Sequence, residues 1–546
     1  MTAILFTPRI FLSGTLLFAL VSGALWVRAQ QADTRPLASL LPPGALLYLE
    51  AKDFHGLLNQ WNSSTEKKNW LASDNFGVLS RSRLIQRLAE SQTQFESVAG
   101  VPIELSLLNQ AAGGRTAFAF YDLPNLTFVY LTKLESSRLG SNDLWRNRSK
   151  YRQRQIAGIP FYVNANAASH STVAIAAYND WLVIATGENL IAQTLVLLSG
   201  AKAASLGTES WFTDTTGQAK SAGDLRLVYN LDKLLPTPQF RTYWLQRNAS
   251  ELKPFTAGLA DLFERNNGFE EQRVMLRRSP EPIPAPAPAL NEVWRYAPKA
   301  SSLNRAWSAP NRDTVAAVLQ QVLLAEVSEA PQSEISAPQV SAEGASVGSS
   351  ADFETRIDQP PFRRTQAESI SGLIDSVMKM QPTALLHTQS TAVLNDRVFV
   401  LPQSGAAIQC EHADRDALER SMAGATSILQ TGSLDPLHVT VSGNMIVITR
   451  TEIARAANPP QVPDGTTYLA AFNKEVEWPH YKQLFSLVDR TPVNPIALPS
   501  QNTPTFFSGN LRSLGGTLGR LNHASIESQD NGAQLRETVR YQLRTP

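Results

Sequence analysis

The chain has 546 residues, which is too long for one ordinary hydrophobic core, so two or more domains are expected. Apolar residues make up 43% of the sequence and charged residues 18%, and this apolar share is large enough to fill buried cores. The formal net charge of +1 argues against a dedicated nucleic-acid-binding protein, which would carry a basic stripe.

The N-terminus has the pattern of an export signal. Arg9 precedes residues 10–25, which carry no charge, and Val27-Arg28-Ala29 then fits a small-x-small cleavage site. Residues 1–29 are therefore predicted to be a secretory signal peptide. The alternative is an uncleaved anchor, because residues 10–27 are marginally long enough to span a membrane. Both interpretations predict an exported protein, periplasmic or associated with the cell envelope, and an uncleaved anchor adds membrane association.

Cysteine usage limits how the fold can be stabilised. Cys410 is the only cysteine, so no intramolecular disulfide can form and the fold must rest on its cores. This composition fits a large bacterial exported protein better than a small disulfide-rich secreted domain.

Residues 40–61 predict the unit that recurs along the chain. A Pro-Pro-Gly turn at 42–44 leads into residues 45–51, which are apolar at both alternating sets of positions and predict a strand buried on both faces, Leu47 included. Asp53 can cap the helix that follows. Helical spacing is seen in Phe54, Leu57, Leu58 and Trp61.

The rest of the first half predicts helices and antiparallel hairpins. A helix is expected over 81–99, with one face marked by Leu84, Leu88, Phe95 and Val98. Hairpins are expected at 116–134 and at 173–185, the second turning at Tyr178-Asn179-Asp180. A strand at 225–231 followed by Asp232 repeats the opening unit, and a charged strand over 271–277 ends this half.

Composition predicts the domain boundaries. The proline-rich segment 280–290 is expected to be a stiff linker between a first lobe at 38–279 and a second lobe at 291–546. Residues 325–352 are rich in Ser, Ala, Glu and Gly and predict a disordered insert in the second lobe.

The second half predicts similar elements in a similar order. Three strands are expected over 384–388, 397–401 and 406–410, then a helix after Asp414 and a hairpin over 437–449. A strand is expected over 466–472, with Asn473 as the cap of the helix that follows. That helix has Tyr481, Leu484, Phe485 and Val488 on one face, and a terminal strand is expected over 535–543.

This order predicts an α+β fold of two similar tandem lobes. Each lobe would be a mainly antiparallel sheet, built from hairpins and strand-cap-helix units, with helices packed on it. We infer a degenerate tandem duplication. The alternative is that the similar order of elements arose by chance, because any α+β chain contains such similarities.

The chain resembles a family of large bacterial exported proteins. The resemblance depends on LPPGALLYLEAKD at 41–53, on the hairpin and helix at 173–198, and on the overall layout. These proteins are filed as a domain of unknown function. The resemblance implies an exported protein and supplies no activity and no catalytic residues.

Two patterns suggest chemistry. Residues 344–348 match G-x-S-x-G, but a nucleophile elbow needs a strand before it and a helix after it, and this segment has neither. His412, Asp414 and Asp416 follow Cys410 and are weak candidates for a metal site. We favour a strand end followed by a helix whose first turn is acidic. No cofactor is expected.

Residues 146–154, RNRSKYRQR, form a basic run that could bind anionic lipid, polysaccharide or nucleic acid. The interpretation we favour is a solvated loop. The scattered tryptophans invite a sugar-binding interpretation, although most lie at apolar positions typical of a core.

Two classes of function remain open. The first is a non-catalytic exported envelope protein, a binding or scaffolding module whose partner is an envelope protein or a polysaccharide and not a nucleic acid. The second is an exported hydrolase with a site assembled from distant residues. The sequence shows no compact catalytic pattern, which favours the first without excluding an enzyme.

Overall fold

The computed structural model describes residues 35–81, 83–122, 125–166, 171–237, 252–281, 289–298, 301–324, 370–393, 400–429, 437–449, 461–479 and 519–544. The expected signal at 1–29, most of the linker at 280–290, the insert at 325–352 and the apolar helix face expected at Tyr481, Leu484, Phe485 and Val488 lie outside these residues. The fold is mixed α+β with antiparallel sheet, which confirms the predicted class. Two compact units divide after Glu281, and the first also takes in Gly532–Arg536.

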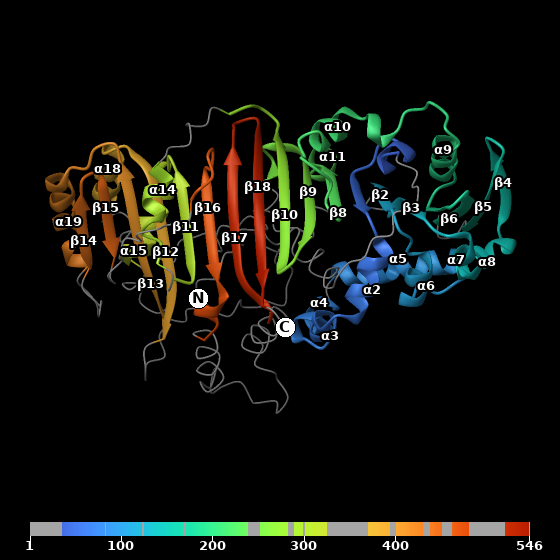
Figure 1. The fold of residues 1–546 in the computed structure, drawn as a ribbon, viewed down its shortest axis with the longest axis horizontal. Helices are drawn as coiled ribbons and strands as arrows, with labels where there is room; N and C mark the ends of the chain where they lie inside the picture. The colour runs from blue at the N-terminus through green and yellow to red at the C-terminus, as the bar shows by residue number, and fades with distance from the viewer. Residues whose placement is uncertain are drawn as a thin grey trace, which may run out of the picture. The chain divides into compact units, whose positions relative to one another are not determined.

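The first unit is built on an antiparallel sheet (Figure 1). Its described strands are β1 (Leu47–Ala51), β2 (Thr116–Asp122), β3 (Thr127–Lys133), β4 (Arg152–Ile156), β5 (Ile159–Asn166), β6 (Ser171–Tyr178), β7 (Trp181–Ala185), β8 (Leu225–Asn230), β9 (Phe255–Arg265) and β10 (Gly268–Arg277). Their spatial order is β10–β9–β8–β1–β2–β3–β7–β6–β5–β4, and every neighbouring pair is antiparallel. β4 is therefore an edge strand.

Helices cover both faces of this sheet. Those described are η1 (Leu37–Leu40), α2 (Phe54–Ser63), α3 (Thr65–Leu71), α4 (Asp74–Leu79), α5 (Arg83–Ala99), α6 (Leu105–Ala111), α7 (Ser136–Ser141), α8 (Asp143–Arg146), η2 (Asn147–Lys150), α9 (Glu188–Leu198), η3 (Leu206–Thr208), α10 (Ser210–Thr216) and α11 (Leu231–Leu234). Alternate residues of β7 enter different cores: Val183 packs with the α9 core, while Leu182 and Ile184 pack with the α5–α6 core. Successive strand side chains point to opposite faces, so this apolar strand is buried throughout.

The opening unit forms with one correction. β1 is followed by α2, whose first turn is capped by the Asp53 carboxylate, which accepts a hydrogen bond from the Gly56 amide at 3.0 Å. Leu47 is only partly buried, so the expectation that both faces of this strand are fully buried is wrong. Tyr48, on the opposite face, is completely buried against Phe212 of α10.

The second unit is also built on antiparallel strands. They are β11 (Leu303–Ser308), β12 (Pro382–Val393), β13 (Val400–Cys410), β14 (His438–Ser442), β15 (Met445–Thr449), β16 (Tyr468–Asn473), β17 (Leu521–Asp530) and most of β18 (Gln534–Leu543). The order β17–β16–β11–β12–β13–β15–β14 is antiparallel throughout. Its helices include α14 (Ala289–Trp294), α15 (Arg312–Leu324), α18 (Ser371–Lys379) and α19 (Arg415–Leu429), and a helical segment over 474–479 follows β16.

Several expected elements differ from those observed. The three strands expected between 384 and 410 are two long strands, β12 and β13, paired along their length. The basic run at 146–154 is not one loop: it comprises the end of α8, η2 and the start of edge strand β4. Asn230 caps the helix after β8, where the sequence suggested Asp232, because its side chain accepts a hydrogen bond from the Lys233 amide.

Candidate functional site

The weak metal candidates lie at the start of α19. The Asp414 carboxylate accepts a hydrogen bond from the Ala417 amide at 2.9 Å and so caps this helix. His412 and Asp416 are exposed, and Asp414 is exposed beside its cap bond. Cys410 is buried in the core, where burial raises the pKa of its thiol to about 11. No cluster of three His, Cys, Asp or Glu side chains suited to a metal ion occurs among the described residues.

A serine–histidine pair, which the sequence did not indicate, lies on β12 and β13. His387 Nε2 is 2.7 Å from Ser404 Oγ, and His387 Nδ1 is 2.8 Å from a terminal nitrogen of Arg305 on β11. The strand register places Arg305 directly opposite His387. Burial, and then the Arg305 guanidinium, hold the pKa of His387 well below its ordinary value.

The hydrogen bond between His387 and Ser404 runs in the opposite direction to that of a catalytic pair. An arginine has no acceptor and stays protonated, so Arg305 donates to His387 Nδ1. The neutral imidazole then carries its proton on Nε2 and donates it to Ser404 Oγ. A general base must accept the serine proton at that nitrogen. In this arrangement His387 does not activate Ser404.

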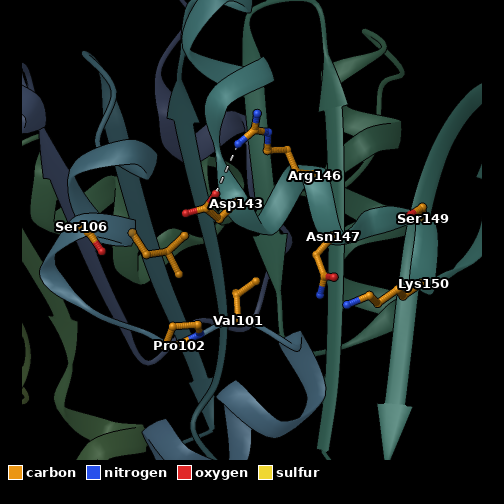
Figure 2. A pocket seen from close by; sticks show the side chains of 9 residues that line it. Val101, Pro102, Ser106, Asp143, Arg146, Asn147, Ser149 and Lys150 are labelled. Atoms are coloured by element: carbon orange, nitrogen blue, oxygen red, sulfur yellow. Dashed lines mark ion pairs between the residues drawn. The ribbon is translucent and has the colours of Figure 1, made fainter.

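The first unit contains a concave pocket of about 410 Å³ between the segment leading into α6 and the segment α8–η2 (Figure 2). Small-molecule sites usually occupy roughly 300–1,000 Å³, so the volume suits a small ligand. The lining side chains are Val101, Pro102, Ser106, Leu107, Asp143, Arg146, Asn147, Ser149 and Lys150. The wall thus combines a small apolar surface with hydroxyl, amide and charged groups.

Hydrogen bonds to α6 fix the position of α8. The Asn142 side chain caps α8 by accepting from the Trp145 amide at 3.0 Å. The Asp143 amide donates to Gln110 Oε1, and Gln110 Nε2 donates back to Asp143 Oδ2, both at 2.9 Å. Because the two bonds are reciprocal, they hold the two sides of the pocket together.

The end of α5 holds η2. Two donors converge on the carbonyl oxygen of Ala99: Asn147 Nδ2 at 2.6 Å and the Tyr151 hydroxyl at 2.8 Å. The last carbonyls of a helix lack partners within the helix, so these side chains satisfy one of them. The chain turns away at Gly100, whose φ of 66° suits a residue without a Cβ.

The cations around the pocket have different surroundings. Arg148 lies over the Trp145 ring at 4.4 Å and donates to the Trp145 carbonyl at 2.7 Å, so it is used structurally. Arg146 is 3.8 Å from Asp143, but both side chains are more than half exposed, and such pairs contribute little. Lys150 has no hydrogen-bond or ion-pair partner among the described residues. Figure 2 shows its side chain directed toward Asn147.

The sequence indicated only half of this site. The basic run pointed to Arg146 and Lys150, although as parts of a solvated loop. Ser106 and Gln110 come from a helix about forty residues earlier and carry no local signal of binding. The hydrogen bonds between α6 and α8, together with the shared apolar core of Leu107 and Leu144, bring the two segments together.

Comparisons with known proteins supply no family. No family model matches the sequence, and no curated protein matches it. Among solved structures, crystal form I of TP0453 has 13% identity and a TM-score of 0.24, covering 46% of this chain and 82% of that one. Crystal form III of TP0453 has 13% identity and a TM-score of 0.24, covering 45% and 81%. A likeness this slight supports no conclusion about fold or function.

In the described part of the chain, no helix is both long and apolar enough to cross a bilayer.

Proposed function

We propose that this protein is a non-catalytic exported envelope protein that acts as a binding module and uses the α6/α8–η2 pocket as its ligand site. The observation that carries the proposal is the pocket itself: it has the volume of a small-molecule site, and at its rim are two cations, one weakly paired and one without a described partner.

We also infer that the two units derive from an internal duplication, which the strand orders support. Seven antiparallel strands of the two units can be aligned one for one. In the second unit their order is β17–β16–β11–β12–β13–β15–β14, and in the first it is β9–β8–β1–β2–β3–β7–β6. Capping residues stand at equivalent places: Asp53 and Asn311 come after β1 and β11, and Asn230 and Asn473 are the last residues of β8 and β16. On this alignment β16 is the counterpart of β8.

On this alignment, the α8–η2 side of the pocket belongs to a segment that the first unit has in addition. Between β3 and β6 the first unit contains α7, α8, η2, β4 and β5, whereas the described residues between β13 and β14 form α19 alone. Binding sites are disproportionately built on segments added to a rigid scaffold. The position of the pocket therefore supports a role in binding.

The alternative is an exported hydrolase, and the 2.7 Å contact between Ser404 and His387 is the observation in its favour. The donor role of His387 argues against it. A Ser404→Ala variant decides between them. A panel of chromogenic ester, amide and glycoside substrates should show no Ser404-dependent turnover, and loss of a measurable activity in the variant would support the hydrolase.

Export and the family resemblance belong to the same proposal. The test places a photo-crosslinking amino acid at Ser149 in the pocket or, as a control, at the exposed Lys202, in intact cells. We expect the protein in the envelope fraction and an adduct from position 149 that position 202 does not form. A cytosolic protein, or identical adducts from both positions, would overturn the proposal.

A further inference from the structure

The chemistry of the pocket wall indicates a class of ligand, an inference that rests on the proposed binding function. We propose that the α6/α8–η2 pocket binds an acidic sugar, a carboxylated or phosphorylated unit of an envelope glycan. Arg146 and Lys150 would meet the negative group, and the polar side chains of the wall would meet hydroxyl groups. The charge of the pocket wall, its hydrogen-bonding groups and its volume of about 410 Å³ point to this ligand class.

Charge favours an anion. Arg146 and Lys150 line the pocket with a single carboxylate, Asp143, so the wall has a net positive charge. Asp143 already accepts a hydrogen bond from Gln110 at 2.9 Å, which partly offsets its repulsion of an incoming anion. Arg146 can exchange its weak bond to Asp143 for a charge-assisted bond to the ligand.

Hydrogen bonding favours a hydroxylated ligand over a bare anion. Ser106 and Ser149 present hydroxyls that both donate and accept. Asn147 keeps its side-chain oxygen as an acceptor while its nitrogen donates to Ala99. Val101 and Pro102 add a small apolar surface against which the C–H face of a sugar ring can rest. Donors, acceptors and an apolar surface together match a sugar acid.

The same features argue against nucleic acid. Single-stranded nucleic acids are bound by grooves that combine positive charge with aromatic stacking platforms. No aromatic side chain lines this pocket. The ring of the nearby Trp145 is already covered by the Arg148 guanidinium and is therefore not open for stacking with a base.

The test is isothermal titration of the full-length protein with α-1,4-tetragalacturonate, glucose 1-phosphate, inorganic phosphate and the neutral maltotetraose. We expect one or both acidic sugars to bind more tightly than phosphate alone, and maltotetraose not to bind. Lys150→Gln and Arg146→Gln should each weaken binding about tenfold. Arg152→Gln removes the same charge from exposed edge strand β4, outside the pocket lining, and should leave the affinity unchanged.

Each other outcome overturns the inference. Absence of binding by both acidic sugars refutes the ligand class, and equal affinity for phosphate refutes the sugar requirement. If Arg152→Gln and Lys150→Gln lose the same affinity, the acidic sugar is attracted by the general positive charge of this surface and not by a specific site. Tm values of the variants within about 2 °C of wild type exclude misfolding as the cause of a loss. If the Ser149 photo-crosslink forms in cells while both acidic sugars fail, the binding function stands and only this inference falls.

Discussion

His387 gives the sharpest prediction about stability. It is 1% exposed, is hydrogen-bonded at both ring nitrogens and faces the Arg305 guanidinium, so its folded form resists protonation. Burial and this cation lower its folded-state pKa well below 6.5. The unfolded chain binds the proton normally. Stability is therefore fully present above the unfolded pKa and falls with pH below it, until the folded pKa is reached.

The magnitude follows from proton linkage. Between pH 7.5 and 5.5 a histidine of ordinary pKa becomes protonated in the unfolded state, which costs the folded state about 1.4 kcal/mol if folded His387 stays neutral. The amide introduced by a His387→Gln substitution does not titrate, yet it can accept from Arg305 and donate to Ser404. We expect the free energy of unfolding of the variant to fall about 1.4 kcal/mol less than that of wild type over this interval.

Urea unfolding followed by circular dichroism at pH 7.5 and 5.5 measures this difference. His55 and His523 also have lowered pKa values, mainly through burial, but they are present in both proteins and cancel. The reasoning would be refuted by equal pH dependence in wild type and variant, because folded His387 would then protonate as easily as the unfolded residue.

Three further predictions concern the first unit. Asp261 is 1% exposed and accepts two 2.7 Å hydrogen bonds from Arg226. Asp261→Ala leaves the Arg226 charge without this partner and should lower the free energy of unfolding in urea by about 3–5 kcal/mol. The double variant Arg226→Met, Asp261→Leu removes both charges and should cost far less. Tyr48→Ala should cost about 3–5 kcal/mol, and partly buried Leu47→Ala less than about 2 kcal/mol; the reverse order would contradict the observed burial. Asp53→Ala should cost about 1 kcal/mol through loss of the cap, and an unchanged midpoint would show that the cap is dispensable.

The sequence predicted elements best where the local pattern was sufficient. The hairpin at 173–185 appears as β6 and β7, turning at Asn179 with a φ of 51°, because apolar runs flanking Asn-Asp specify both strands and turn. The charged strand expected over 271–277 lies within β10, which pairs with β9. Strands of this kind can be predicted from the local sequence alone, without knowing which distant segments pack against them.

Prediction failed where a distant partner decides the outcome. Leu88 was expected on the apolar face of the helix over 81–99, but it is 46% exposed, because the core contacts of α5 come from its C-terminal half, at Phe95 and Val98. β4 has no apolar alternation and is a strand because β5 pairs with it. The pocket depends on Gln110 meeting Asp143, which no local pattern encodes.

The basic run at 146–154 shows why composition alone could not assign its role. Edge strands carry charged residues that block pairing with other chains, and Arg152 and Arg154 have such positions on β4. Arg154 also lies 3.4 Å from Glu188, and Arg148 packs on Trp145. Only Arg146 and Lys150 then remain for a ligand. Because neighbouring cations in one run serve three different purposes, a charge count would overestimate the strength of the site, and binding should respond to these two residues and not to the other cations of the run.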